Sequence, residues 1–156
     1  MARSTALRDA IKKRFYPLVE RKGFVRVHAS NYFTEFRRLH AGRVDVFDVQ
    51  WEKHWRPLFV LNFGQSPAGA AGDKISTTEV DRSQLNRTGR LQRRRGGSLG
   101  CWFGLRRPWL NVLTSGRWAY TIDEVVDELI DAFDEFEAWW NDGSEGPHIY
   151  IWRIAA

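Results

Sequence analysis

The spacing of apolar residues changes along this 156-residue chain, and each change marks a different kind of secondary structure. From Ser4 to Lys22, apolar side chains recur every three or four positions, which predicts an amphipathic helix that Gly23 can end. Pro17 lies inside this pattern, and proline removes a backbone donor from a helix. We therefore expect a kink around residues 13–15, and not a break in the helix.

Between Phe24 and Gly64 the apolar period falls to two, which is the spacing of β-strands. Aromatic and β-branched residues predict strands at 24–27, 32–39, 44–51 and 58–63. The Ala41-Gly42 pair predicts a tight turn between the second and third of these strands. Because the connections are short, the strands are expected to form an antiparallel meander.

The segment from Gln65 to Gly97 lacks an apolar period and is rich in Gly, Ala, Ser, Thr, Asn and Arg. We predict a long mobile loop over residues 65–97, and loops of this length are usually functional or disordered. Strand character returns at Leu99–Leu105, and Trp109–Leu113 predicts a further short strand.

A second amphipathic helix is predicted from Thr121 to about Trp140. Thr121 and Glu124 have the spacing of a capping box, apolar residues form one stripe, and carboxylates occupy the opposite face. Residues 149–154 predict a final strand or a packed tail. The sequence therefore predicts one α+β domain over residues 1–156, with an antiparallel β-meander of about four to six strands. The two amphipathic helices are expected on one face of this sheet, and the other face is expected to be partly open.

These elements resemble the bacterial family catalogued as domain of unknown function 4304. The resemblance is carried by Lys22-Gly23-Phe24, by Val44-x-Val46-x-x-Val49-Gln50 followed by Trp51-x-Lys53, by Phe59-x-Leu61-Asn62-x-Gly64, and by Trp109 or Trp118 ahead of the closing helix. It skips residues 65–95. The resemblance implies an α+β fold, and it implies no particular activity because that family has no established function.

Composition narrows the range of functions. The single cysteine, Cys101, excludes an intramolecular disulfide and a multi-cysteine zinc site, and it is expected to be a buried small hydrophobe. The four histidines lack the spacing of metal ligands, so we predict no metal, no cofactor and no catalytic residue. Because no stretch approaches about 18 apolar residues, we expect a cytoplasmic protein with no membrane partner. A binding module is favoured over an enzyme.

Charge is divided into two blocks, and each block predicts a different binding function. Residues 82–122 carry nine arginines and no acidic residue, whereas residues 123–145 carry ten carboxylates and no Lys or Arg. The formal net charge of +5 therefore conceals two strong fields of opposite sign.

The acidic block predicts a non-enzymatic protein-interaction module that binds a basic protein partner, and an immunity-like module is one form of it. The candidate residues are Asp127, Glu128, Asp131 and Asp134. Two other interpretations remain open, because a carboxylate-rich face is typical of any surface helix and could also neutralise the arginines of the same chain.

The arginine-rich segment 82–117 predicts the alternative, a module that binds single-stranded nucleic acid. Arginine binds phosphate through paired donors, and aromatic rings stack on bases. The candidate residues are Arg90, Arg93, Arg94, Arg95, Arg106 and Arg107. Three tryptophans, at positions 102, 109 and 118, are interleaved with them. Strand alternation predicts that these indoles pack in the core and leave the charged groups facing outward.

Two amides, Gln50 and Asn62, lie in otherwise apolar strands. A buried amide costs free energy unless its hydrogen bonds are satisfied. Either a satisfied hydrogen bond in the protein interior or the floor of a pocket on the sheet is expected there.

Overall fold

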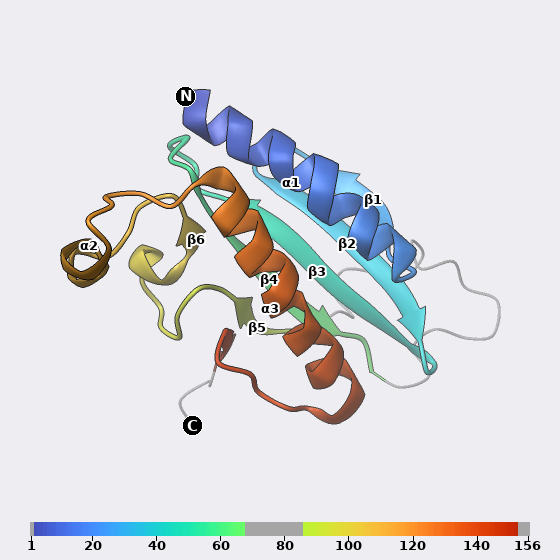
Figure 1. Cartoon of the computed structure of the whole chain (residues 1–156). Coiled ribbons are helices and arrows are strands. Elements are labelled where there is room, and N and C mark those ends of the chain that lie inside the picture. Colours follow the sequence, from blue (N-terminus) through green and yellow to red (C-terminus); the bar gives the residue numbers. More distant parts are fainter. Residues whose placement is uncertain (1, 68–85, 153–156) are drawn as a thin grey trace.

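A computed structural model describes residues 2–67 and 86–152 and shows an antiparallel sheet with two long helices across one face (Figure 1). Within these residues the sheet has seven strands, in the order β1-β2-β3-β4-β5-β7, with β6 also paired to β4. The strands are β1 (Val25–Ala29), β2 (Phe33–His40), β3 (Arg43–Trp51), β4 (Leu58–Gln65), β5 (Asn86–Leu91), β6 (Phe103–Gly104) and β7 (Ile149–Ile151). The α+β class and the antiparallel sheet are confirmed.

The two long helices have the ends that the sequence predicts. Helix α1 (Ala2–Arg21) continues through Pro17, and helix α3 (Ile122–Asp142) begins with the capping box. The Thr121 hydroxyl accepts from the Glu124 backbone N–H at 3.1 Å, and the Glu124 carboxylate accepts from the Thr121 N–H at 2.7 Å. In the described part of the chain, no helix has both the length and the apolarity required to cross a bilayer.

The core lies between these helices and the sheet, and aromatic rings fill it. Phe47 on β3 occupies its centre, with ring centroids 6.2 Å from Phe15 of α1 and 5.4 Å from Phe133 of α3. Its ring also stacks on Phe36 of β2 at 5.1 Å. These side chains are fully buried, so one side chain joins both helices to the sheet.

The second face of the sheet is partly open, as the sequence predicts. It is exposed toward its β1–β2 margin, at Val25 and Leu39, but Val44, Val46 and Val60 are at most 6% exposed. Apolar residues alternate with the core residues here, so both faces of β3 and β4 carry them, as in strands buried on both sides.

Asn62 lies on this second face and has satisfied hydrogen bonds. Its amide donates to Asp48 at 2.7 Å and to Gln50 at 2.9 Å, and it accepts from Arg90 Nε at 3.1 Å. Of the two expectations for this amide, the satisfied hydrogen bond is therefore the correct one.

Three predictions for the region after β4 are wrong in whole or in part. Strand β5 lies within the predicted 65–97 loop, of which residues 68–85 fall outside the described residues. Its sequence looks like a loop because it is polar and contains Gly89, where a Cβ would collide with the Tyr150 carbonyl oxygen of β7. The predicted strand at 99–105 is reduced to β6, preceded by a 3₁₀ turn at Leu99–Cys101.

The predicted strand at 109–113 is instead the short helix α2 (Trp109–Ser115). A short apolar run fits either structure by periodicity alone. Pro108 immediately precedes the helix, and Gly116 ends it with a left-handed φ of 67°. These two flanking residues are the local signals for a helix.

Replacing Phe47 by alanine is expected to destabilise the fold by about 3 to 5 kcal/mol, because it leaves a cavity between both helices and the sheet. Urea denaturation followed by circular dichroism measures this change. The matched control is Leu39→Ala on the exposed margin of β2, with an expected change within about 0.5 kcal/mol. A loss below about 1 kcal/mol for Phe47→Ala would contradict its central place in the core.

Candidate functional site

The strand ladder beside β4 is interrupted, and residues 92–102 leave the sheet at the interruption. Leu91 of β5 pairs with Leu61, and Phe103 of β6 pairs with Phe59. Because β3 pairs with the opposite edge of β4, β5 and β6 share one edge and run in the same direction along it. On β4 a single residue, Val60, separates the two pairings. We call residues 92–102 the excursion.

Hydrogen bonds to backbone carbonyls hold the excursion in shape. The buried Gln92 side chain donates to the carbonyls of Arg94 at 2.8 Å and Gly96 at 2.6 Å. The Arg94 backbone N–H donates to the Cys101 carbonyl at 3.1 Å. Cys101 is partly exposed, and not buried as predicted, because it belongs to this turn and not to a strand.

The excursion, the start of β4 and the chain around α2 enclose a groove of about 540 Å³. Arginine and tryptophan dominate its lining, which includes Arg56, Arg93, Arg94, Arg106, Arg107, Trp102, Trp109 and Trp118. Among the described residues that line it, none is Asp or Glu. We call this site the arginine groove.

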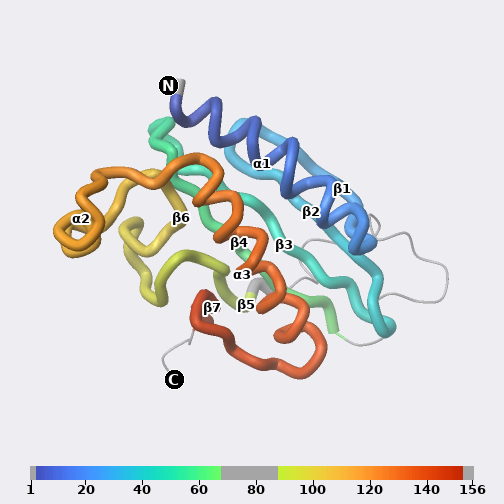
Figure 2. The backbone as a smooth tube through the Cα atoms, viewed as in Figure 1, coloured from blue at the N-terminus to red at the C-terminus, as the bar shows by residue number. Residues whose placement is uncertain are grey.

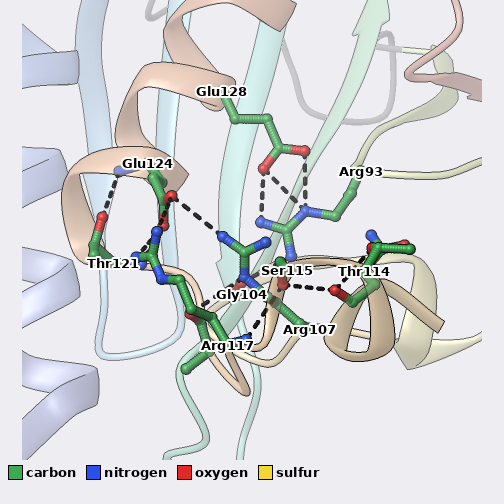
Figure 3. A network of polar contacts seen from close by, with 11 residues as sticks. Arg93, Gly104, Arg107, Thr114, Ser115, Arg117, Thr121, Glu124 and Glu128 are labelled. Carbon is green, nitrogen blue, oxygen red and sulfur yellow. Dashed lines mark hydrogen bonds and ion pairs between the residues drawn. The ribbon is translucent and has the colours of Figure 1, made fainter. Parts of the chain in front are cut away.

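Carboxylates behind the groove hold some of its arginines in place (Figure 3). Arg93 binds Glu128 of α3 through two nitrogens, at 2.9 and 2.6 Å, and also donates to the Gly104 carbonyl at 2.8 Å. Arg107 and Arg117 share Glu124, each at 3.2 Å. These contacts orient the guanidinium groups and neutralise part of their charge.

The ion pairs leave positive charge uncompensated. Arg94 donates to the Gly100 carbonyl at 2.9 Å, and within residues 2–67 and 86–152 neither Arg94 nor Arg106 has a carboxylate partner. Glu124 in turn serves two arginines. The described residues that line the groove therefore carry net positive charge, which favours an anionic ligand.

Hydrogen bonds favour the charged form of two carboxylates, Glu124 and Glu52, and Glu52 pairs with Arg56 of the groove. The pKa of Glu124 is lowered, chiefly because the Thr121 backbone N–H donates to it. The pKa of Glu52 falls from its ordinary value of 4.5 to about 2, chiefly because it accepts from the Arg56 side chain at 3.0 Å. Backbone N–H groups of His54 and Arg56 also donate to Glu52, at 2.8 and 3.3 Å.

The tryptophans of the groove differ in exposure. Trp102 is 7% exposed, which confirms that it packs inward, and among residues 2–67 and 86–152 its Nε1 has no hydrogen-bond partner. Trp109 and Trp118 are 69% and 78% exposed, so the prediction that they pack in the core is wrong. Strand alternation does not apply to them, because Trp109 begins helix α2 and Trp118 follows it.

The structure brings together four of the six arginines predicted as site residues: Arg93, Arg94, Arg106 and Arg107 line the groove. Arg95 donates instead to the Gly146 carbonyl at 2.8 Å. Arg90 lies on the second face of the sheet, with its guanidinium 5.6 Å from the Trp102 ring and 5.3 Å from the Trp152 ring. Burial lowers the pKa of Arg90.

Sequence reasoning missed Arg56, which lies between β3 and β4 and also lines the groove. Arg56 follows Lys53, His54 and Trp55 in the sequence, outside the arginine-rich segment. Its place at the groove depends on the pairing of β6 with Leu58 at the start of β4. This is a contact between segments far apart in the chain.

The acidic residues of α3 that were predicted to bind a partner largely contact cations of the same chain. Asp127 binds Arg14 of α1, Glu128 binds Arg93, and Asp134 lies 3.5 Å from Lys22. In the described part of the chain, Asp131 alone of the four has no ion pair. The binding of a basic protein partner to these carboxylates stays a prediction.

The groove lining is suited to binding. Across residues 2–67 and 86–152, no three His, Cys, Asp or Glu side chains gather closely enough to hold a metal ion. Arginine donors bind anions, and indole rings bind planar groups. The arrangement can therefore hold a ligand that is both anionic and aromatic.

Replacing Glu52 by glutamine is expected to make the free energy of unfolding depend less on pH between about 4.5 and 2. Since the folded pKa of Glu52 is depressed, its contribution is complete above about pH 4.5 and is lost as the pH falls through about 2. Urea denaturation at several pH values between 7 and 2 measures the effect. Glu20→Gln, an exposed change on α1, should stay within about 0.5 kcal/mol of the parent at pH 7. If the free energy of unfolding of Glu52→Gln depends on pH as strongly as that of the parent, the pKa of Glu52 is not depressed.

Comparisons of the chain with protein-family models, with curated proteins and with solved structures find no match. The resemblance to the family catalogued as domain of unknown function 4304 therefore stays a prediction. The arginine groove itself is the basis for a functional proposal.

Proposed function

We propose that the arginine groove binds a segment of single-stranded nucleic acid. One observation carries the proposal: five arginines and three tryptophans line a single cavity, without an acidic side chain among its described lining residues. Single strands are bound by a positive groove that follows the backbone together with aromatic rings that stack on bases. The groove supplies both kinds of contact in one place.

The free charge in the groove supports phosphate binding. Within the described residues, neither Arg94 nor Arg106 forms an ion pair with a carboxylate. A phosphate can therefore bind them without breaking an ion pair. Arg93 is held by Glu128 and the Gly104 carbonyl, which reduces the entropy lost on binding. Binding through phosphates should weaken as salt rises.

The exposed indoles support base stacking. Trp109 and Trp118 present most of their surface to solvent at the groove, and each stacked base contributes roughly 1 to 3 kcal/mol. Stacking tolerates any base, because every base has a flat face. We therefore expect weak sequence preference and a clear preference for single strands over duplex.

A basic protein partner for α3 has less support. Three of its four candidate carboxylates already contact arginine or lysine of this chain, at the positions of Asp127, Glu128 and Asp134. Such a partner would have to compete with these ion pairs, including the Arg93 contact that shapes the groove.

The test is the fluorescence anisotropy of a labelled ten-nucleotide single strand titrated with the protein at several salt concentrations. Neutralising two groove cations, in Arg94→Gln/Arg106→Gln, should reduce the slope of log K against log salt by about 1.4, since each phosphate contact contributes about 0.7. The affinity at low salt should fall at least roughly tenfold.

The matched control is Lys12→Gln/Lys13→Gln, which removes two exposed cations from α1 and changes the net charge equally. This variant should keep the parent slope and affinity. An equal loss in both double variants would mean binding through net charge alone, and no anisotropy change at low salt would remove the proposal.

A further inference from the structure

Helix α2 and the residues that flank it present large apolar side chains to solvent. We call residues 108–118 the α2 knob, and it projects away from the sheet and the long helices (Figures 1 and 2). Leu113 and Trp118 are 74% and 78% exposed, and Trp109 and Leu110 are 69% and 58% exposed. Within α2, Val112 is the residue that is buried. Contiguous exposed apolar side chains of this size mark interaction surfaces.

The groove does not account for the whole of this patch. Leu110 lines the groove, but Leu113 does not, and an aliphatic side chain gives a base no stacking surface. Leu113 is nevertheless among the most exposed large apolar side chains. Leu113 is therefore an exposed apolar side chain of the knob that the proposed nucleic-acid site does not use.

Charge around the knob is positive. Residues 99–120 contain no Asp or Glu, while Arg106 and Arg117 border the apolar side chains. Arg117 shares Glu124 with Arg107, so one carboxylate serves two guanidinium groups. A partner that covers the knob must combine an apolar interior with an anionic border.

We propose that the α2 knob docks on an anionic lipid surface. Leucine and tryptophan side chains enter the boundary between headgroups and acyl chains, and arginines beside them contact anionic headgroups. A second copy of the chain fits less well, because pairing two knobs would bring Arg106 and Arg117 of both copies together. The sequence argument against a membrane partner rested on the lack of a spanning segment, and peripheral docking requires none.

Sedimentation with lipid vesicles tests the proposal. The protein should sediment with vesicles of phosphatidylcholine containing roughly one third phosphatidylglycerol, and much less with phosphatidylcholine alone or at high salt. Leu113→Asp should weaken sedimentation at least roughly tenfold, because it places a charge where the side chain enters the lipid. Leu113→Asn, which adds no charge beside the groove, should also weaken sedimentation while it keeps the affinity for the single strand within about twofold of the parent.

Leu39→Asp is the matched control, since Leu39 is 51% exposed on β2, far from the knob in sequence. It should leave vesicle binding unchanged. The proposal is overturned if the protein does not sediment with anionic vesicles, or if Leu113→Asp and Leu39→Asp bind the vesicles equally well. It is also overturned if the protein does not bind vesicles and sedimentation velocity shows a dimer that Leu113→Asp abolishes. In that case the knob is an interface with a second copy of the chain.

Discussion

The site depends on one constraint of the sheet: β5 and β6 pair with the same edge of β4, with Val60 alone between their pairings. Leu91 and Phe103 both face the core, so the packing fixes each end of the excursion. Residues 92–102 then have no place in the ladder and must leave the sheet. They carry arginines and Trp102 to the start of β4, where Arg56 meets them.

The two charge blocks of the sequence lie against each other in the fold. Glu124 and Glu128 of α3 bind Arg107 and Arg93 of the groove lining, while other α3 carboxylates bind Arg14 and Lys22 of α1. The acidic helix therefore positions the basic segment in addition to covering the core. Because arginines outnumber carboxylates at the groove, the pairing leaves a positive field there.

Sequence reasoning succeeds where a local pattern decides the structure and fails where distant contacts do. The Thr121 capping box and the strand that contains Phe47 depend on near neighbours and on period two, and both are as predicted. The polar strand β5 and the place of Arg56 depend on segments far along the chain, so no local signal reveals them. The prediction that Trp109 lies buried on a strand is wrong because a short apolar run fits a strand or a helix equally.

The most direct measurement of the central claim uses the indole N–H signals of the eight tryptophans in a ¹⁵N-labelled protein, titrated with a single-stranded oligonucleotide. The indoles at the groove, Trp102, Trp109 and Trp118, should shift, while Trp51 and Trp140 in the core should not. Unchanged groove signals at saturating oligonucleotide, or shifts confined to tryptophans outside the groove, would contradict the account.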